Sequence, residues 1–277
     1  MTEAAPPIAS RAGRNLPAAI ATGVTLLAIV ALSLAFNPVA FVGVAIVACL
    51  IGIWELARAF TARGLDVPVL PVWVGAIGIL VNAWVLGASG MVIALVLTAA
   101  TVFVWRVLDG GGPGAVQDAA AGIFVATYIP FLAGFAVLMA HEHNGAALVA
   151  TFILLVVGND TGGYVVGVLF GKHPIAPSIS PKKSWEGAVG SFLLTTAVAA
   201  VAMHLWMDIP LWWAPILGVF IVITATTGDF AESLLKRDLG IKDFGIILPG
   251  HGGMMDRLDS LLLTAPAAWL VFTVGVR

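Results

Sequence analysis

Residues 67–105 read VPVLPVWVGAIGILVNAWVLGASGMVIALVLTAATVFVW, and this stretch contains no charged side chain. A helix needs about 20 apolar residues to cross the hydrocarbon core of a bilayer, so the stretch has room for two crossings. They are predicted over residues 67–88 and 90–105, with a turn near Ser89. So long an uncharged run indicates a chain that passes repeatedly through a membrane.

The composition of the whole chain agrees with this interpretation. Of 277 residues, 60% are hydrophobic and 10% are charged, and the mean hydropathy is +1.05. Soluble domains carry about 45–50% apolar and 25% charged residues, so a soluble globular enzyme is excluded. The net charge of −2 provides no basic field for a nucleic acid backbone, and no nucleic acid partner is expected.

The same length criterion predicts an all-α, polytopic integral membrane protein with about nine transmembrane helices. The first apolar run is longer than the roughly 7–15 residues of a signal-peptide core, and we expect it to be a retained helix. Residues 1–15, which precede it, are predicted to form a cytoplasmic tail. Besides the two runs quoted above, the apolar runs cover residues 16–36, 39–57, 119–140, 146–170, 187–207, 209–228 and 258–276.

The positive charges predict the orientation of these helices, because Lys and Arg concentrate in cytoplasmic loops. With a cytoplasmic N-terminus, alternate gaps place twelve of the thirteen basic residues inside, and only Arg277 falls outside. This split predicts an integral protein of the plasma membrane whose polar loops face the cytoplasm. The residues predicted inside are Arg11, Arg14, Arg58, Arg63, Arg106, Lys172, Lys182, Lys183, Lys236, Arg237, Lys242 and Arg257.

Two of the predicted cytoplasmic gaps, with the helix ends beside them, hold most of the polar residues. The first covers residues 158–187, and the second covers residues 227–260. A solvated loop would explain charges in the gaps themselves. It would not explain carboxylates within or against apolar segments, where an ionisable side chain is costly and marks a functional site. Carboxylates of this kind are Asp160, Asp256 and Asp259.

The residue types in the second gap suit phosphate chemistry. Asp229 ends one apolar run and Asp256 precedes the next, so an antiparallel helix pair would bring carboxylates together at one interface. Carboxylate oxygens suit Mg²⁺, which is held by one or two carboxylates plus substrate phosphates. Nearby cations can pair with phosphate oxygens, and glycines around His251 allow backbone N–H groups to approach an anion. The pattern predicts phosphoryl or nucleotidyl transfer. For His251, phosphate contact and acid–base work remain equally open.

The order of these residues resembles the signature of the phosphatidate cytidylyltransferase, or CDP-diacylglycerol synthase, family. The matching positions are Ser233, Lys236, Arg237, Lys242, Asp243, Pro249, His251, Gly252, Gly253, Asp256, Arg257 and Asp259. The upstream segment Pro181-Lys182-Lys183-Ser184-Trp185-Glu186-Gly187 is similar to the lysine-rich block of the same family. The resemblance is strong over residues 150–265, and it implies that residues 16–277 form a single transmembrane catalytic domain.

What the resemblance implies is a reaction of CTP with phosphatidic acid in the membrane, giving CDP-diacylglycerol and pyrophosphate with magnesium as cofactor. It implies Asp229 and Asp256 as the chief metal carboxylates, with Asp160 and Asp259 as alternative or supporting ligands. The implied catalytic residues are Asp229, Asp256, Ser233, Lys236 and Arg237. The implied substrate-binding residues are Lys182, Lys183, Lys242, His251, Gly252, Gly253 and Arg257. An additional monovalent cation and a homodimer are left open.

Two other functions fit parts of the pattern. A CTP-dependent polyprenol kinase would share the membrane setting and the metal, but it would transfer the γ-phosphoryl group and release CDP. A multipass transporter would use Asp160 and a broken helix near residues 159–163 for ion binding. The sequence has no internal repeat, and its charges lie on one side of the membrane, which disfavours the transporter.

Overall fold

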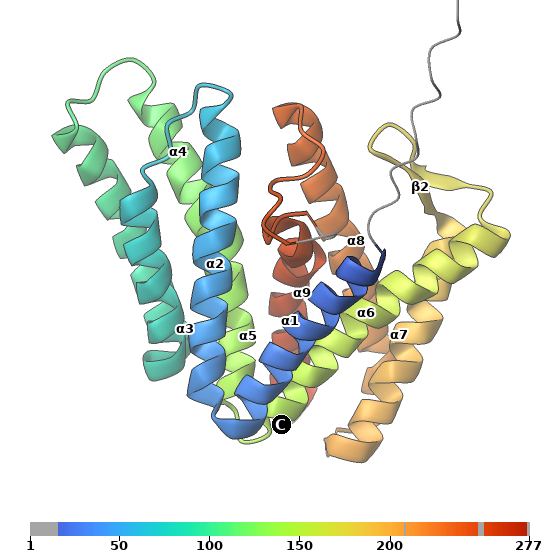
Figure 1. Ribbon diagram of the computed structural model, residues 1–277. Coiled ribbons are helices and arrows are strands. Elements are labelled where there is room, and N and C mark those ends of the chain that lie inside the picture. Colours follow the sequence, from blue (N-terminus) through green and yellow to red (C-terminus); the bar gives the residue numbers. More distant parts are fainter. Residues whose placement is uncertain (1–15, 208, 249–251, 276–277) are drawn as a thin grey trace, which may run out of the picture.

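Helices make up most of the computed structural model, which describes residues 16–207, 209–248 and 252–275, with side chains from residue 20 onward. The chain forms a bundle of long helices (Figure 1). In chain order the elements are α1 (Leu16–Phe36), α2 (Pro38–Thr61), α3 (Val69–Leu108), α4 (Ala115–Ala126), η1 (Thr127–Phe131), α5 (Leu132–His141), α6 (Gly145–Phe170), β1 (Pro174–Ala176), β2 (Ser180–Ser184), α7 (Trp185–Trp206), α8 (Trp213–Leu239) and α9 (Met255–Gly275).

The predicted all-α polytopic architecture is confirmed at the level of the helices. Within the described ranges, seven helical segments are long and apolar enough to cross a membrane, and the described apolar part of α1, Ile20–Phe36, is shorter. One of the seven joins α4, η1 and α5 into a continuous segment, Ala115–His141. Its π-helical turn contains Pro130, whose missing N–H interrupts the regular hydrogen-bond ladder.

Helix α3 contains both of the apolar runs that the sequence placed on either side of Ser89. At Gly87 the backbone leaves the helical region, with φ 69° and ψ −157°, a conformation open mainly to glycine. The chain folds back there, and the two halves of α3 pack against each other. A Cβ added to Gly75 would collide with the side chain of Thr98 on the other half. The break lies two residues before the predicted one. The total of nine crossings stays a prediction.

Glycines allow α6 and α7 to pack closely. A Cβ on Gly162 would lie 2.5 Å from the carbonyl oxygen of Gly190, and a Cβ on Gly190 would lie 2.5 Å from the carbonyl oxygen of Gly162. Small residues at such a crossing let two membrane helices approach backbone to backbone. Beside the crossing, Ser191 Oγ donates a 2.6 Å hydrogen bond to the carbonyl oxygen of Asn159. The close packing of α6 and α7 therefore fixes the backbone of α6 at Asn159, directly before Asp160.

A two-stranded antiparallel hairpin, β1 and β2, connects α6 to α7, and the sequence interpretation did not predict it. Ser184 ends the hairpin and caps α7, because its Oγ accepts a 3.1 Å hydrogen bond from the N–H of Gly187. Lys182 and Lys183 therefore lie on a strand at the entrance to a helix.

The two helices around the second polar gap are longer than predicted. Helix α8 continues past residue 228 to Leu239, and α9 begins at Met255 rather than at residue 258. The polar residues from Asp229 to Arg237 therefore lie on a helix. Figure 1 shows the C-terminal end of α8, the hairpin, the α2–α3 connection and residues 109–114 at one end of the bundle. The α1–α2 turn and residues 142–144 lie at the other end.

Candidate active site

A cavity of about 310 Å³ opens between α6, the hairpin, α7 and α8. Four of the predicted site residues line it: Asp160 from α6, Lys182 and Lys183 from β2, and Asp229 from α8. Residues brought together from three different elements in this way supply both cations and carboxylates to a single space. The cavity is therefore the candidate active site.

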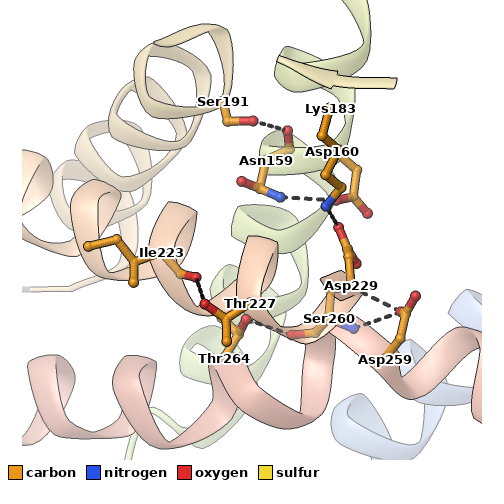
Figure 2. A network of polar contacts seen from close by, with 10 residues as sticks. All are labelled: Asn159, Asp160, Lys183, Ser191, Ile223, Thr227, Asp229, Asp259, Ser260 and Thr264. Atoms are coloured by element: carbon orange, nitrogen blue, oxygen red, sulfur yellow. Dashed lines mark hydrogen bonds and ion pairs between the residues drawn. The ribbon is translucent and has the colours of Figure 1, made fainter. Parts of the chain in front are cut away.

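An ion pair between Lys183 and Asp229 joins the hairpin to α8 (Figure 2). The Lys183 ammonium group also lies 5.3 Å from the centre of the Phe230 ring, a cation–π distance. Asp229 is within electrostatic reach of two further carboxylates, Asp160 and Asp259. One lysine therefore offsets part of a concentrated negative charge. A metal cation could take its place beside the carboxylates, and an anionic substrate could take the place of Asp229 beside the lysine.

Local hydrogen bonds orient the other two carboxylates. Asp160 Oδ1 accepts a 3.0 Å bond from Asn159 Nδ2. Asp259 Oδ1 accepts bonds from Ser260, 2.7 Å from its N–H and 3.3 Å from its hydroxyl group. Figure 2 shows Asp160, Asp229 and Asp259 on three neighbouring helices, with Lys183 reaching in from above.

Gly228 sets the approach of α9 to α8 beside these carboxylates. A Cβ at Gly228 would lie 2.8 Å from the carbonyl oxygen of Asp259 and 3.0 Å from the Cα of Ser260. Both are backbone atoms, so only glycine fits without moving a helix. This crossing holds Asp229 close to Asp259.

A second polar cluster lies where α8 meets the start of α9. Asp256 is buried, and its Oδ1 lies 2.5 Å from Lys236 Nζ. Its Oδ2 accepts hydrogen bonds from the N–H of Gly253 at 2.7 Å and from the N–H of Phe244 at 3.2 Å. Lys236 also lies 2.9 Å from Glu232 Oε1, one helical turn earlier. The oxygens of Asp256 therefore have partners away from the cavity, whereas Asp229, which pairs with Lys183, lines the cavity.

The other predicted residues have varied surroundings. Ser233 is half-buried on α8, and Lys242 is exposed. Arg237 donates a hydrogen bond to the carbonyl oxygen of Ser178 in the hairpin turn. Arg257 interacts electrostatically with Asp160, and its buried Nε has no hydrogen-bond partner among the described residues.

The predicted glycine turn lies only partly in the described structure. His251 lies outside the described residues. Gly252 has a φ of 84°, which favours glycine, and a Cβ there would lie 2.8 Å from Asp256 Oδ2. The N–H of Gly253 donates to the same carboxylate. These glycines therefore serve the close approach of Asp256, and their predicted contact with phosphate stays a prediction.

Glu55 of α2 is a polar residue of this region that the sequence interpretation missed. It is only 1% exposed, and its Oε2 accepts a 2.8 Å hydrogen bond from the N–H of Met255, the first residue of α9. Its signal in the sequence was a carboxylate inside the apolar run 39–57, where such a group is costly. Glu232 was also missed, although it lies within the second polar gap.

The donor set suits a magnesium ion only when a substrate completes it. Among the residues with described positions, no group of three or more His, Cys, Asp or Glu side chains is placed to hold a metal ion alone. Mg²⁺ commonly takes one or two carboxylates and completes its shell with substrate phosphates and water. Asp229 with Asp160 or Asp259 would supply that number of carboxylates, and all three offer hard oxygen ligands.

Comparison with known proteins shows the family of this chain. The model of the cytidylyltransferase family matches residues 17–274, nearly the whole chain. The chain belongs to the cytidylyltransferase family. It is 40% identical over 278 residues to the phosphatidate cytidylyltransferase of Mycobacterium bovis, covering 96% of this chain and 90% of that protein. The cytidylyltransferase of the same name from Mycobacterium leprae is 39% identical over 95% of this chain and 89% of its own length. The one from Haemophilus influenzae is 37% identical over 50% of this chain and 52% of its own.

Proposed function

We propose that this protein transfers the cytidylyl group of CTP to phosphatidic acid, giving CDP-diacylglycerol and pyrophosphate. The proposal depends on one observation: in a chain of the cytidylyltransferase family, two lysines and two aspartates converge on a cavity at one end of an apolar helix bundle. Such a place is accessible to a soluble nucleotide and adjacent to lipid. The names of the relatives supply the two substrates.

The lysines of β2 would bind the phosphates. Lys182 is exposed and Lys183 is half-buried at the cavity. Lys183 would exchange the carboxylate of Asp229 for a phosphate oxygen, which offers the same charge-assisted hydrogen bond. Arg257, whose Nε has no partner within the described structure, would contribute a further cation beside Asp160.

In the proposed reaction, a phosphate oxygen of phosphatidic acid attacks the α-phosphorus of CTP. The bond from that phosphorus to the bridging oxygen of the β-phosphate breaks, and pyrophosphate leaves with the electron pair. The direct transfer forms no covalent enzyme intermediate. The contribution of Lys182, Lys183 and Arg257 would be to neutralise the triphosphate and the pyrophosphate as charge develops.

Asp229, together with Asp160 or Asp259, would hold a magnesium ion against the phosphates. When bound, the ion would supply positive charge to the triphosphate and to the departing pyrophosphate. The sequence also predicted Asp256 as a metal ligand. Asp256 does not line the cavity, and Lys236 and two backbone N–H groups hold its oxygens, so the carboxylates beside the lysines of the cavity are favoured here. A second, monovalent cation stays a prediction.

The membrane arrangement is also proposed. The ends of α6 and α8, the hairpin and most of the predicted inner basic residues lie at one end of the bundle, which the distribution of positive charge assigns to the cytoplasm. We place the protein in the plasma membrane with nine crossings, a cytoplasmic tail at residues 1–15 and the catalytic site facing the cytoplasm. A homodimer stays a prediction.

The reaction products test the proposal against its alternatives. Purified protein in detergent, supplied with CTP, phosphatidic acid and Mg²⁺, is expected to form CDP-diacylglycerol and pyrophosphate in equal amounts. Formation of CDP with a phosphorylated polyprenol would support the kinase instead. Absence of both products, with CTP unchanged and the protein folded, would contradict the proposed activity.

A further inference from the structure

The buried carboxylate of Glu55 links α2 to the start of α9, far away in the sequence. The N–H groups of the first turn of a helix lack partners within the helix and carry partial positive charge. Glu55 Oε2 satisfies one of them, the N–H of Met255, at 2.8 Å. The contact is therefore an N-terminal cap supplied by a different helix.

Two glycines show that the chain is shaped around this carboxylate. A Cβ on Gly253 would lie 2.5 Å from Glu55 Oε2 and 2.6 Å from Oε1, and a Cβ on Gly245 would collide with Oε1. Gly245 and Gly253 lie on the two sides of the α8–α9 connection, at the point where Leu248 and Gly252 pair as a short β-bridge. Both segments of the α8–α9 connection therefore pack against the carboxylate of Glu55.

Burial of the Glu55 carboxylate destabilises the fold. Glu55 is 1% exposed, and its Oε1 has no hydrogen-bond partner among the described residues. Burial of an incompletely bonded carboxylate opposes folding, and the nearby carboxylate of Asp256 adds repulsion. An apolar residue would fill the same place in α2 without these costs.

We propose that Glu55 is a positioning residue for the cytidylyl transfer proposed above, on which this inference rests. Glu55 fixes Gly245, Gly253 and the N-terminus of α9, and it thereby holds Asp256 against Lys236. Because Asp259 follows Asp256 on the same helix, the position of Asp259 beside Asp229 also depends on this anchor. Glu55 does not line the cavity, so it acts through these residues and not on the substrate.

Substitution of Glu55 tests the proposal in full-length protein. Deuterium uptake over residues 241–248 and 252–259, measured without substrates, is expected to rise in Glu55→Ala and to stay unchanged in α6 and α7. The kcat is expected to fall about tenfold or more, because a displacement of about 1 Å can cost 100-fold. The KM for CTP is expected to stay within about threefold, since the lost contact does not bind substrate.

A conservative variant and a second site separate positioning from simple loss of folding. Glu55→Gln keeps an oxygen that can accept the N–H of Met255, and it is expected to restore most of the protection and the kcat. Gly245→Ala retains Glu55 but places a methyl group against Oε1, so it should reproduce the local increase in uptake even if Glu55→Ala does not fold. The matched controls are Glu142→Ala and Glu142→Gln at an exposed site, and Gly43→Ala, whose Cβ meets open space.

The proposal is overturned if Glu55→Ala leaves uptake over these segments unchanged, raises it equally in α6 and α7, or is not rescued by Glu55→Gln. It is also overturned if Gly245→Ala matches Gly43→Ala. These outcomes differ from failure of the proposed function. A wild-type protein that makes no CDP-diacylglycerol would refute that function, whereas deuterium uptake tests the anchor without any reaction.

Discussion

Half-buried Lys236 on α8 and buried Asp256 on α9 form an ion pair, with Nζ 2.5 Å from Oδ1. The pair joins the two helices that frame the second polar cluster, and it is extended by Glu232 on one side and by the N–H groups of Phe244 and Gly253 on the other. A network with partners on all sides fixes the geometry of its members better than an isolated pair does.

The first prediction concerns the coupling of this pair. Lys236→Met should lower the free energy of unfolding by about 1–3 kcal/mol, because it leaves a buried acceptor without one of its donors. Asp256→Asn should cost a similar amount. The double variant should lose less than the sum of the two, with a coupling of about 1 kcal/mol or more. Denaturation of the wild type, the two single variants and the double variant in the same detergent measures the coupling. Additive losses would show that Lys236 and Asp256 do not stabilise each other.

The second prediction concerns the carboxylate at the cavity. Asp229→Asn retains the size of the side chain but removes its charge, and turnover should fall by about 100-fold, the loss typical of a single electrostatic contact to the reacting groups. Asp238→Asn makes the same chemical change at an exposed position of the same helix. It should change activity by no more than the equivalent of about 0.5 kcal/mol. Similar activities for the two variants would move the active site away from the cavity.

The third prediction concerns the cofactor. Because all of the candidate ligands are carboxylates, turnover should stop in excess EDTA and return when Mg²⁺ is added. Initial rates in metal-free buffer, measured before and after the addition, check this. Undiminished turnover in the chelator would refute the proposed role of Asp229 in holding a metal.

The fourth prediction concerns orientation. The single cysteine of the chain, Cys49, is 1% exposed, so cysteines introduced at exposed sites can be labelled against a low background. A membrane-impermeant maleimide should label Glu142→Cys in intact cells, and it should label Lys172→Cys only after permeabilisation. The reverse pattern would place the cavity on the outer side of the membrane.

The helix positions could be predicted well because apolar length is a strong signal in a membrane protein. The limits of α6 and α7 were predicted to within one or two residues, since charged or polar gaps flank them. The end of α8 was predicted too early because hydropathy falls after Gly228 while the helix continues. Hydrogen bonds along the backbone, and not hydropathy, keep residues 229–239 helical.

The candidate site could be predicted only in part. Asp160, Lys182, Lys183 and Asp229 lie on three elements. The polar gaps indicated that these residues lie on the same side of the membrane, but not that they line one cavity. The division between Asp229 at the cavity and Asp256 in the buried network was not predictable, because both are aspartates near the ends of apolar runs. Glu55 could have been noticed as a carboxylate inside an apolar run, but its partner, the backbone N–H of Met255, could not be predicted from the sequence.

The fate of each phosphate of CTP tests the central claim most directly. Wild-type protein is incubated with phosphatidic acid and CTP labelled at the α-phosphate or, separately, at the γ-phosphate. The Asp229→Asn variant, treated in the same way, gives the background signal. Transfer of the cytidylyl group predicts that the α-label enters the lipid and the γ-label leaves in pyrophosphate. Entry of the γ-label into the lipid, with the α-label remaining in CDP, would contradict it.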